Sequence, residues 1–244
     1  MMKRVFGVIV VAVLLASPAM AAKYDVEILG SLGDKTFADF IREAGAATAY
    51  RALSPAEPQG ITGFDIGVAV SAIDIDQDTW DELLGGDAPS YLPIPSIRLR
   101  KGLPYNIDVG AFYSQVPSSN IKLMGGEVQV ALLEGGIASP ALALRGSYST
   151  LQGVDDLDLS TYGADAVLSK GFAMLTPYVG VGVVRIEGDY AGDDPFIKSN
   201  LDEHSFTETR YFGGVQMSMA LFRLTLDAEY LERPVYSLKV SLGW

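Results

Sequence analysis

His204 is the only histidine in the chain, and histidine is the side chain best suited to acid-base chemistry near neutral pH. It stands in the stretch LDEHSFTE, with Ser205 directly after it and Asp202 and Glu203 before it. A hydrolase would require a serine or carboxylates within hydrogen-bond reach of the imidazole. Neighbouring side chains on a strand point to opposite faces, so His204 and Ser205 would not form that pair there. We therefore interpret His204 as a solvated loop residue and predict no enzymatic activity. A hydrolase whose imidazole is oriented by the two carboxylates is the alternative.

The acidic stretch DIDQDTWDE carries carboxylates at alternate positions, which is the arrangement that a hard cation such as calcium requires. It consists of Asp74, Asp76, Asp78, Asp81 and Glu82 with the residues between them. The twelve-residue calcium loop does not fit, because a threonine stands where glycine is needed and a glycine stands where the bidentate glutamate belongs. We interpret this stretch, and the similar GDYAGDDP with Asp189, Asp193 and Asp194, as solvated acidic loops. The sequence thus predicts neither a metal nor a cofactor.

A third set of charged residues recurs at alternate positions within apolar stretches. If these stretches are strands, the charges share the face opposite the apolar one. The set contains six acids and four bases, which are Asp65, Arg98, Arg100, Asp108, Glu127, Arg145, Asp165, Asp227, Glu229 and Lys239. Charges on an enclosed face must pair or remain hydrated. We predict a mixed-sign network that braces the interior of the protein, with a narrow cation-favouring path as the alternative.

The elements that would position these charges follow a period of two from residue 60 onward. In GFDIGVAVS, Phe64, Ile66, Val68 and Val70 alternate with small or polar residues. The same pattern predicts about ten strands, at residues 64–71, 93–101, 105–114, 125–133, 143–149, 161–169, 177–184, 211–220, 223–230 and 235–244. Each is near the length that a tilted strand needs to cross a bilayer.

The composition of the two strand faces indicates what kind of β protein this is. The polar face is rich in Gly, Ser, Ala, Asp and Gln, which suits the crowded interior of a small barrel. Tyrosines recur near the strand ends, as in the aromatic girdles at a lipid interface. We predict an all-β fold, a closed antiparallel transmembrane β-barrel of about ten strands with a short N-terminal helix. A secreted sandwich or a lipocalin-like barrel is the alternative.

The first residues predict secretion. Lys3 and Arg4 precede an apolar run, and Ala19-Met20-Ala21 forms a small-x-small cleavage pattern, so we interpret residues 1–21 as a signal peptide. Cleavage would leave 16 bases against 30 acids, a formal charge of −14, which argues against nucleic acid as a partner. The chain has no cysteine and so no disulfide.

Residues 22–59 do not follow the strand period. Thr36 is placed to cap a helix in which Phe37, Phe40, Ile41 and Ala44 recur at helical spacing. We favour a helix at the periplasmic rim of the barrel, because a ten-stranded barrel has little spare room. A plug within the lumen is the alternative, and AATAYRAL read as a further strand would upset the even strand count. The barrel itself would comprise residues 60–244.

The chain ends in VYSLKVSLGW, with Tyr236, Leu238, Val240, Leu242 and Trp244 on one side of the last predicted strand. This ending resembles the C-terminal signature of Gram-negative outer-membrane β-barrel proteins, in which alternating apolar residues and a terminal aromatic residue are recognised by the barrel-assembly machinery. The resemblance covers this motif and the architecture of residues 60–244, and it concerns a class. It implies an outer-membrane location, with membrane lipid, lipopolysaccharide and the assembly machinery as partners.

The links between the predicted strands agree with this class. With both barrel ends in the periplasm, the external links are residues 75–91, 115–120, 151–158, 188–205 and 231–234, and three of them are long and acidic. The periplasmic links KGLP, EGGIAS, SKGF and ALF are all short, as in outer-membrane barrels. Divalent ions shared between the acidic loops and lipopolysaccharide are a further hypothesis.

Of three functions, we predict the first below, and the second and the hydrolase at the rim are its alternatives. The first is a non-catalytic barrel with a structural, surface-interaction or narrow transport role. The second is a transporter of hydrophobic compounds, in which the N-terminal segment is a hatch. In that transporter Pro93 and Pro95 would weaken strand pairing, because proline lacks the backbone donor, and would open a side exit.

Overall fold

The computed structural model describes residues 34–76, 90–116, 121–136, 138–192, 194–195 and 200–244. The predicted signal peptide and four of the acidic-loop carboxylates, Asp78, Asp81, Glu82 and Asp193, lie outside these residues. Within the described ranges, the helices are too short or too polar to cross a membrane.

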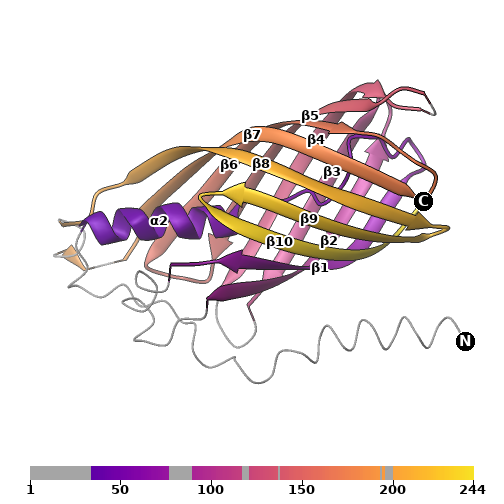
Figure 1. Cartoon of the computed structure of the whole chain (residues 1–244). Coiled ribbons are helices and arrows are strands. Elements are labelled where there is room, and N and C mark those ends of the chain that lie inside the picture. Colours follow the sequence, from indigo (N-terminus) through magenta and orange to yellow (C-terminus); the bar gives the residue numbers. More distant parts are fainter. Residues whose placement is uncertain (1–33, 77–89, 117–120, 137, 193, 196–199) are drawn as a thin grey trace, which may run out of the picture.

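The described chain forms one helix of 15 residues followed by ten strands that close into an antiparallel barrel (Figure 1). Each strand pairs with its neighbours in sequence, and β1 also pairs with β10, so that Ile66 lies opposite Leu242. The elements are α2 (Asp34–Thr48), β1 (Phe64–Asp74), β2 (Tyr91–Leu103), β3 (Ile107–Gln115), β4 (Lys122–Glu134), β5 (Ala141–Gln152), β6 (Leu157–Ser169), β7 (Leu175–Tyr190), β8 (His204–Met219), β9 (Phe222–Leu231) and β10 (Arg233–Gly243). The predicted fold class and strand number are confirmed. The alternative strand at AATAYRAL is wrong, because these residues form the end of α2 and the segment after it.

The strands alternate between an apolar exterior and a mostly polar interior. Closure pairs the edges of the sheet, so the backbone donors and acceptors of the strands find partners within the sheet. The outward side chains are large, apolar and exposed on every strand, for example Ile66, Leu99, Tyr113, Val128, Leu144, Tyr162, Val181, Tyr211, Leu226 and Leu238. An apolar exterior on all sides is expected for a barrel surrounded by lipid and is unfavourable in water.

The two ends of the barrel differ in their connections. We call the end at which β1 begins and β10 ends the terminal end, and the opposite end the loop end. At the terminal end the strands join through short turns such as residues 104–106 and 220–221, where Tyr105, Asn106 and Ala220 adopt positive φ angles. The links after β1 and β7, residues 75–90 and 191–203, are at the loop end and are much longer. The predicted alternation of link lengths is therefore present only in part, because the loop-end links at residues 153–156 and 232 are no longer than the turns at the terminal end.

The N-terminal segment lies inside the barrel. Figure 1 shows α2 toward the loop end, away from the C-terminus. From there the chain runs back through the lumen to the terminal end, where Gln59 lies against Asp108. The helix therefore does not lie at the periplasmic rim, where we predict it from the sequence, but inside the barrel toward the loop end. Space is available because glycines lie on both sides of the contact between the helix and β7. A Cβ atom on Gly188 of β7 would lie 2.5 Å from Ile41, and one on Gly45 of the helix would lie 2.2 Å from Ile186.

Candidate functional site

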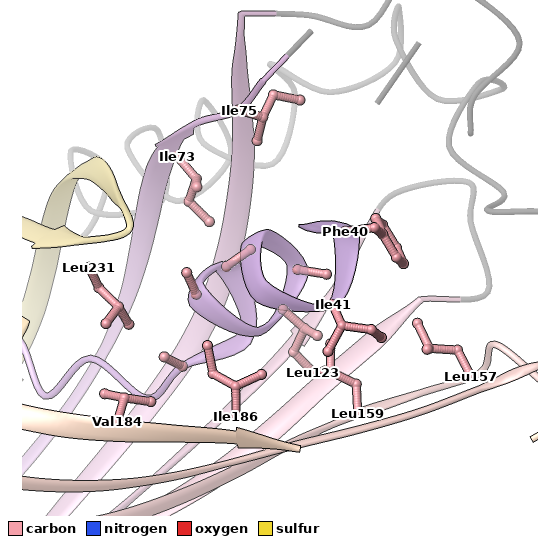
Figure 2. Close-up of a cluster of buried hydrophobic side chains, with 14 of the residues drawn as sticks. Phe40, Ile41, Ile73, Ile75, Leu123, Leu157, Leu159, Val184, Ile186 and Leu231 are labelled. Atoms are coloured by element: carbon pink, nitrogen blue, oxygen red, sulfur yellow. The ribbon is translucent and has the colours of Figure 1, made fainter. Parts of the chain in front are cut away.

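The loop end of the lumen is lined by aliphatic side chains that form what we call the apolar cup. Its wall is made by Ile73, Leu123, Leu157, Leu159, Val184, Ile186, Leu231 and Val235. Figure 2 shows Phe40 and Ile41 of α2 directed into this wall. Phe37 and Ala44 of the same helical face are also buried. The predicted apolar face of the helix is therefore covered by the barrel wall and not by lipid. Burial of such side chains stabilises a fold by about 1.5–3 kcal/mol each.

The N-terminus of α2 is tied to the start of β8. Asp34 accepts a hydrogen bond of 3.0 Å from the backbone N–H of Asp202, and its carboxylate lies 2.9 Å from Nε2 of His204. These two contacts, the backbone N–H first, hold the pKa of Asp34 below its usual value. Thr36 lies within the first turn of the helix and is not its cap.

His204 is engaged in holding the helix. Its ring stacks on Phe206 at 6.0 Å and meets Phe37 at 5.9 Å, and Asp34 is its carboxylate partner. The sequence suggested the adjacent Asp202 and Glu203 for that role, and it gave no signal for a partner 170 residues away. The arrangement positions α2 at the mouth of the barrel.

Ion pairs at the loop end hold the polar face of α2. Arg42 lies 2.9 Å from Glu208, and Glu43 lies 2.9 Å from Arg233. Arg233 also pairs with Asp76 at 2.6 Å, so this carboxylate of the acidic stretch has a cation from the protein itself. No group of three or more metal-ligating side chains occurs in the described part of the chain. Ion pairs at exposed surface positions contribute about 0–1 kcal/mol each, and these pairs are partly exposed.

Residues 49–59 are held much more deeply. Arg51 pairs with Glu229 at 3.0 Å and donates to the carbonyl oxygens of Ala46 and Ala47, so it caps the C-terminus of α2. Arg210 of β8 donates to the carbonyl of Tyr50 at 2.6 Å. Arg210, a wall residue, thereby satisfies a backbone acceptor of a segment that lies outside the strands.

The ten charged residues predicted to face the lumen are all buried there. Nine of them meet in three groups, and Arg98 lies outside these groups. Arg100 pairs with Asp108 at 2.8 Å, and beside them Glu127 lies 3.4 Å from Arg145. Asp65 accepts from Lys239 at 3.2 Å in the second group.

The third group contains predicted residues together with residues that were not predicted. Asp165 pairs with Arg210, and Asp227 accepts a hydrogen bond of 2.6 Å from Tyr178. Arg51, Arg210 and Arg223 complete the interior set and were not predicted. Arg210 and Arg223 have the strand parity of the predicted charges, so the alternation carried a signal for them, whereas nothing in AATAYRAL marks Arg51.

The segment and the charges together fill the lumen. Arg145 donates to the carbonyl of Ser54 at 3.0 Å, and Ser169 accepts from the backbone N–H of Ala56 at 3.0 Å. The cavity bordered by Arg51 and Arg145 has a volume of about 10 Å³, which is roughly what a single water molecule needs. In the described part of the chain, the interior is therefore occupied by residues 49–59 and by charge of both signs, as the sequence predicts.

The predicted assembly motif forms the outer face of the closing strand. Tyr236 and Leu238 are exposed, Val240 and Leu242 are half-buried, and the inward residues between them are buried. Trp244 is exposed, and its backbone N–H donates to the carbonyl of Phe64 at 3.0 Å. The motif thus lies at the seam where β10 meets β1.

Comparison with known proteins gives only distant similarity. No family model matches the chain, and no curated protein matches it. Among solved structures, the chain is similar to the attachment invasion locus protein Ail of Yersinia pestis in complex with the heparin analogue sucrose octasulfate, at 13% identity and a TM-score of 0.30, over 75% of this chain and 97% of that one. It is also similar to LpxR from Salmonella typhimurium, at 13% identity and a TM-score of 0.38, over 73% of this chain and 99% of that one. Neisserial surface protein A matches at 12% identity and a TM-score of 0.29, over 74% of this chain and 94% of that one.

The class of the protein rests on the geometry of its own barrel. A closed antiparallel sheet with an even number of strands, an apolar exterior and a polar interior is the architecture of Gram-negative outer-membrane β-barrel proteins. The chain has this architecture, with a lumen that its own N-terminal segment occupies.

Proposed function

We propose that the protein is an integral outer-membrane barrel of a Gram-negative bacterium, exported by its signal peptide, with a sealed lumen and a structural or surface-interaction role. The observation that carries this proposal is the combination of an apolar exterior on all ten strands with an interior filled by residues 34–59. A porin-like or narrow transport role is less well supported, because the arginines that would line a path donate to the carbonyls of the segment inside it.

Its partners would be membrane lipid, lipopolysaccharide and the barrel-assembly machinery, with the motif from Tyr236 to Trp244 as the assembly signal. Nucleic acid is excluded from this proposal by the acidic charge of the chain. A non-catalytic role is supported by His204, whose ring is held by Asp34 and two aromatic rings.

We expect no sustained single-channel conductance when the purified protein is inserted into planar lipid bilayers. The interior bonds between the wall and residues 49–59 would have to break to admit a column of water and ions. An open porin recorded under the same conditions serves as the positive control. Stable current steps from correctly folded, heat-modifiable protein would refute the sealed lumen.

A further inference from the structure

The seam between β2 and β3 is incomplete at the loop end. Among the described residues, the pairs run from Leu103 opposite Ile107 to Ile97 opposite Tyr113. On its other side, β2 pairs with β1 along its whole length, as far as Tyr91 opposite Asp74. At Pro95 and Ser96, which lie opposite the described residues Gln115 and Ser114, β2 therefore has one paired edge and one unpaired edge.

Two prolines account for this defect. The backbone N–H of Gly102 donates to Gly63, just before β1, so even-numbered residues of β2 direct their backbone groups toward β1 and odd-numbered residues toward β3. Pro93 and Pro95 are odd-numbered, and proline has no N–H to donate. In place of a ladder bond, the Ser114 hydroxyl donates to the carbonyl of Pro95.

The defect lies beside the apolar cup. Ile94 stands between the two prolines, points inward and is buried in the same cluster as the cup residues Ile73 and Leu123. The outer surface on both sides of the seam is apolar, with Ile97 and Tyr113 exposed. The weakest part of the wall thus separates an apolar exterior from an apolar interior.

A buried cation lies on the same inner face of β2. Arg98 is only 8% exposed, and among the described residues no carboxylate lies within ion-pair distance of it. Its guanidinium donates to Ser96 and to the carbonyl of Arg51, and it stacks over the ring of Phe112 at 5.2 Å. The neighbouring wall arginines Arg100 and Arg210 have carboxylate partners, so Arg98 is the described wall arginine best placed to receive an external anion.

We propose that the apolar cup and Arg98 form a binding site for a fatty acid, which enters from the membrane through the β2–β3 seam and displaces α2. The acyl chain occupies the space of the Phe37, Phe40 and Ile41 side chains. The carboxylate accepts the hydrogen bond from Arg98 that the carbonyl of Arg51 otherwise accepts. This rests on the proposed membrane location. Residues 34–43 are the part of the helix suited to leave, because their polar ties to the wall are partly exposed. The end of the helix and residues 49–59 are held by buried bonds.

Binding of tritiated palmitate to the full-length protein in phosphatidylcholine nanodiscs tests the ligand. We expect saturable binding that unlabelled palmitate displaces. Methyl palmitate and lysophosphatidylcholine should not displace it. Arg98→Gln is expected to weaken it by about tenfold or more, since a hydrogen bond to a charged group is lost, and Arg98→Lys to retain part of it. Arg185→Gln, at an exposed arginine of β7, is the control and should bind normally. Absent binding, equal competition by the ester or lysophospholipid, or an unchanged Arg98→Gln variant would each overturn the site.

The entrance has a test of its own, because the chain contains no cysteine. Ser96 and Ser114 lie on the rung beyond Ile97 and Tyr113, and a Ser96→Cys/Ser114→Cys disulfide would lock the seam. We expect the oxidised variant to take up palmitate much more slowly than the same protein after reduction. Equal rates would refute entry through this seam. Heat-modifiable migration of each variant shows that the barrel itself is folded, which separates failure of the site from failure of the proposed membrane barrel.

Discussion

Arg210→Met is expected to destabilise the folded barrel by about 3–5 kcal/mol, because it leaves a buried carboxylate without its cation. The guanidinium of Arg210 pairs with Asp165 and also holds the carbonyl of Tyr50, so the change loosens both the wall and the segment inside it. The measurement is equilibrium unfolding by urea in detergent micelles, followed by intrinsic fluorescence and by heat-modifiable migration.

Two variants make this expectation specific. Arg185→Met removes an ion pair on the outside, where Arg185 is 57% exposed beside Glu187, and should cost less than about 1 kcal/mol. Arg210→Met/Asp165→Leu removes both partners of the buried pair and should recover much of the stability lost in the single variant. If Arg210→Met unfolds at the same urea concentration as Arg185→Met, the interior network does not brace the barrel.

Gly45→Leu is expected to force α2 out of the apolar cup. A Cβ atom at this position would already lie 2.2 Å from the side chain of Ile186, and a whole isobutyl group has no space there. Overpacking of this kind costs about 1–3 kcal/mol. The helix should then become accessible to protease added to intact liposomes, while the strands stay protected.

The matched control is Lys35→Leu, which adds the same side chain to an exposed position of the same helix and should leave α2 protected. Gly45→Ala/Ile186→Ala, which removes the atoms that a small Cβ would meet, should keep the helix bound. Protease resistance of the Gly45→Leu variant equal to that of the unaltered protein would place the helix elsewhere.

The strands were predictable because a barrel obeys a simple rule of alternation. Each outward position meets the same apolar surroundings, and each inward position meets the lumen, so the period of two identifies both faces. The same parity places Asp65, Glu127 and Arg145 in the lumen, where the structure has them. It also covers Arg210, which was missed because the predicted strand began at residue 211 and β8 begins at His204.

The position of α2 was not predictable from the helix alone. The apolar spacing of Phe37, Phe40 and Ile41 shows that one face is buried, but it does not show what covers that face. The signal lay in the strands, where the inward positions become apolar toward the loop end. In β7, Val184 and Ile186 lie on the inward face, which carries Gly180 and Gly182 nearer the terminal end. This change of composition along the strand marks the apolar cup. The contact between His204 and Asp34 depends on the position of the helix, so it could not be predicted without knowing that position.

Contact between lipid and the outer side of the strands is the claim on which the whole account depends. Nitroxide labels on Leu226→Cys and Val181→Cys test it directly in liposomes, since both positions are outward and exposed on β9 and β7 and no native cysteine interferes. We predict that oxygen, which concentrates in the bilayer, relaxes both labels more strongly than a water-soluble nickel chelate, with the reverse order for Lys35→Cys at the mouth. Stronger relaxation by the chelate at Leu226 and Val181 would show that water surrounds the barrel, and would contradict the account.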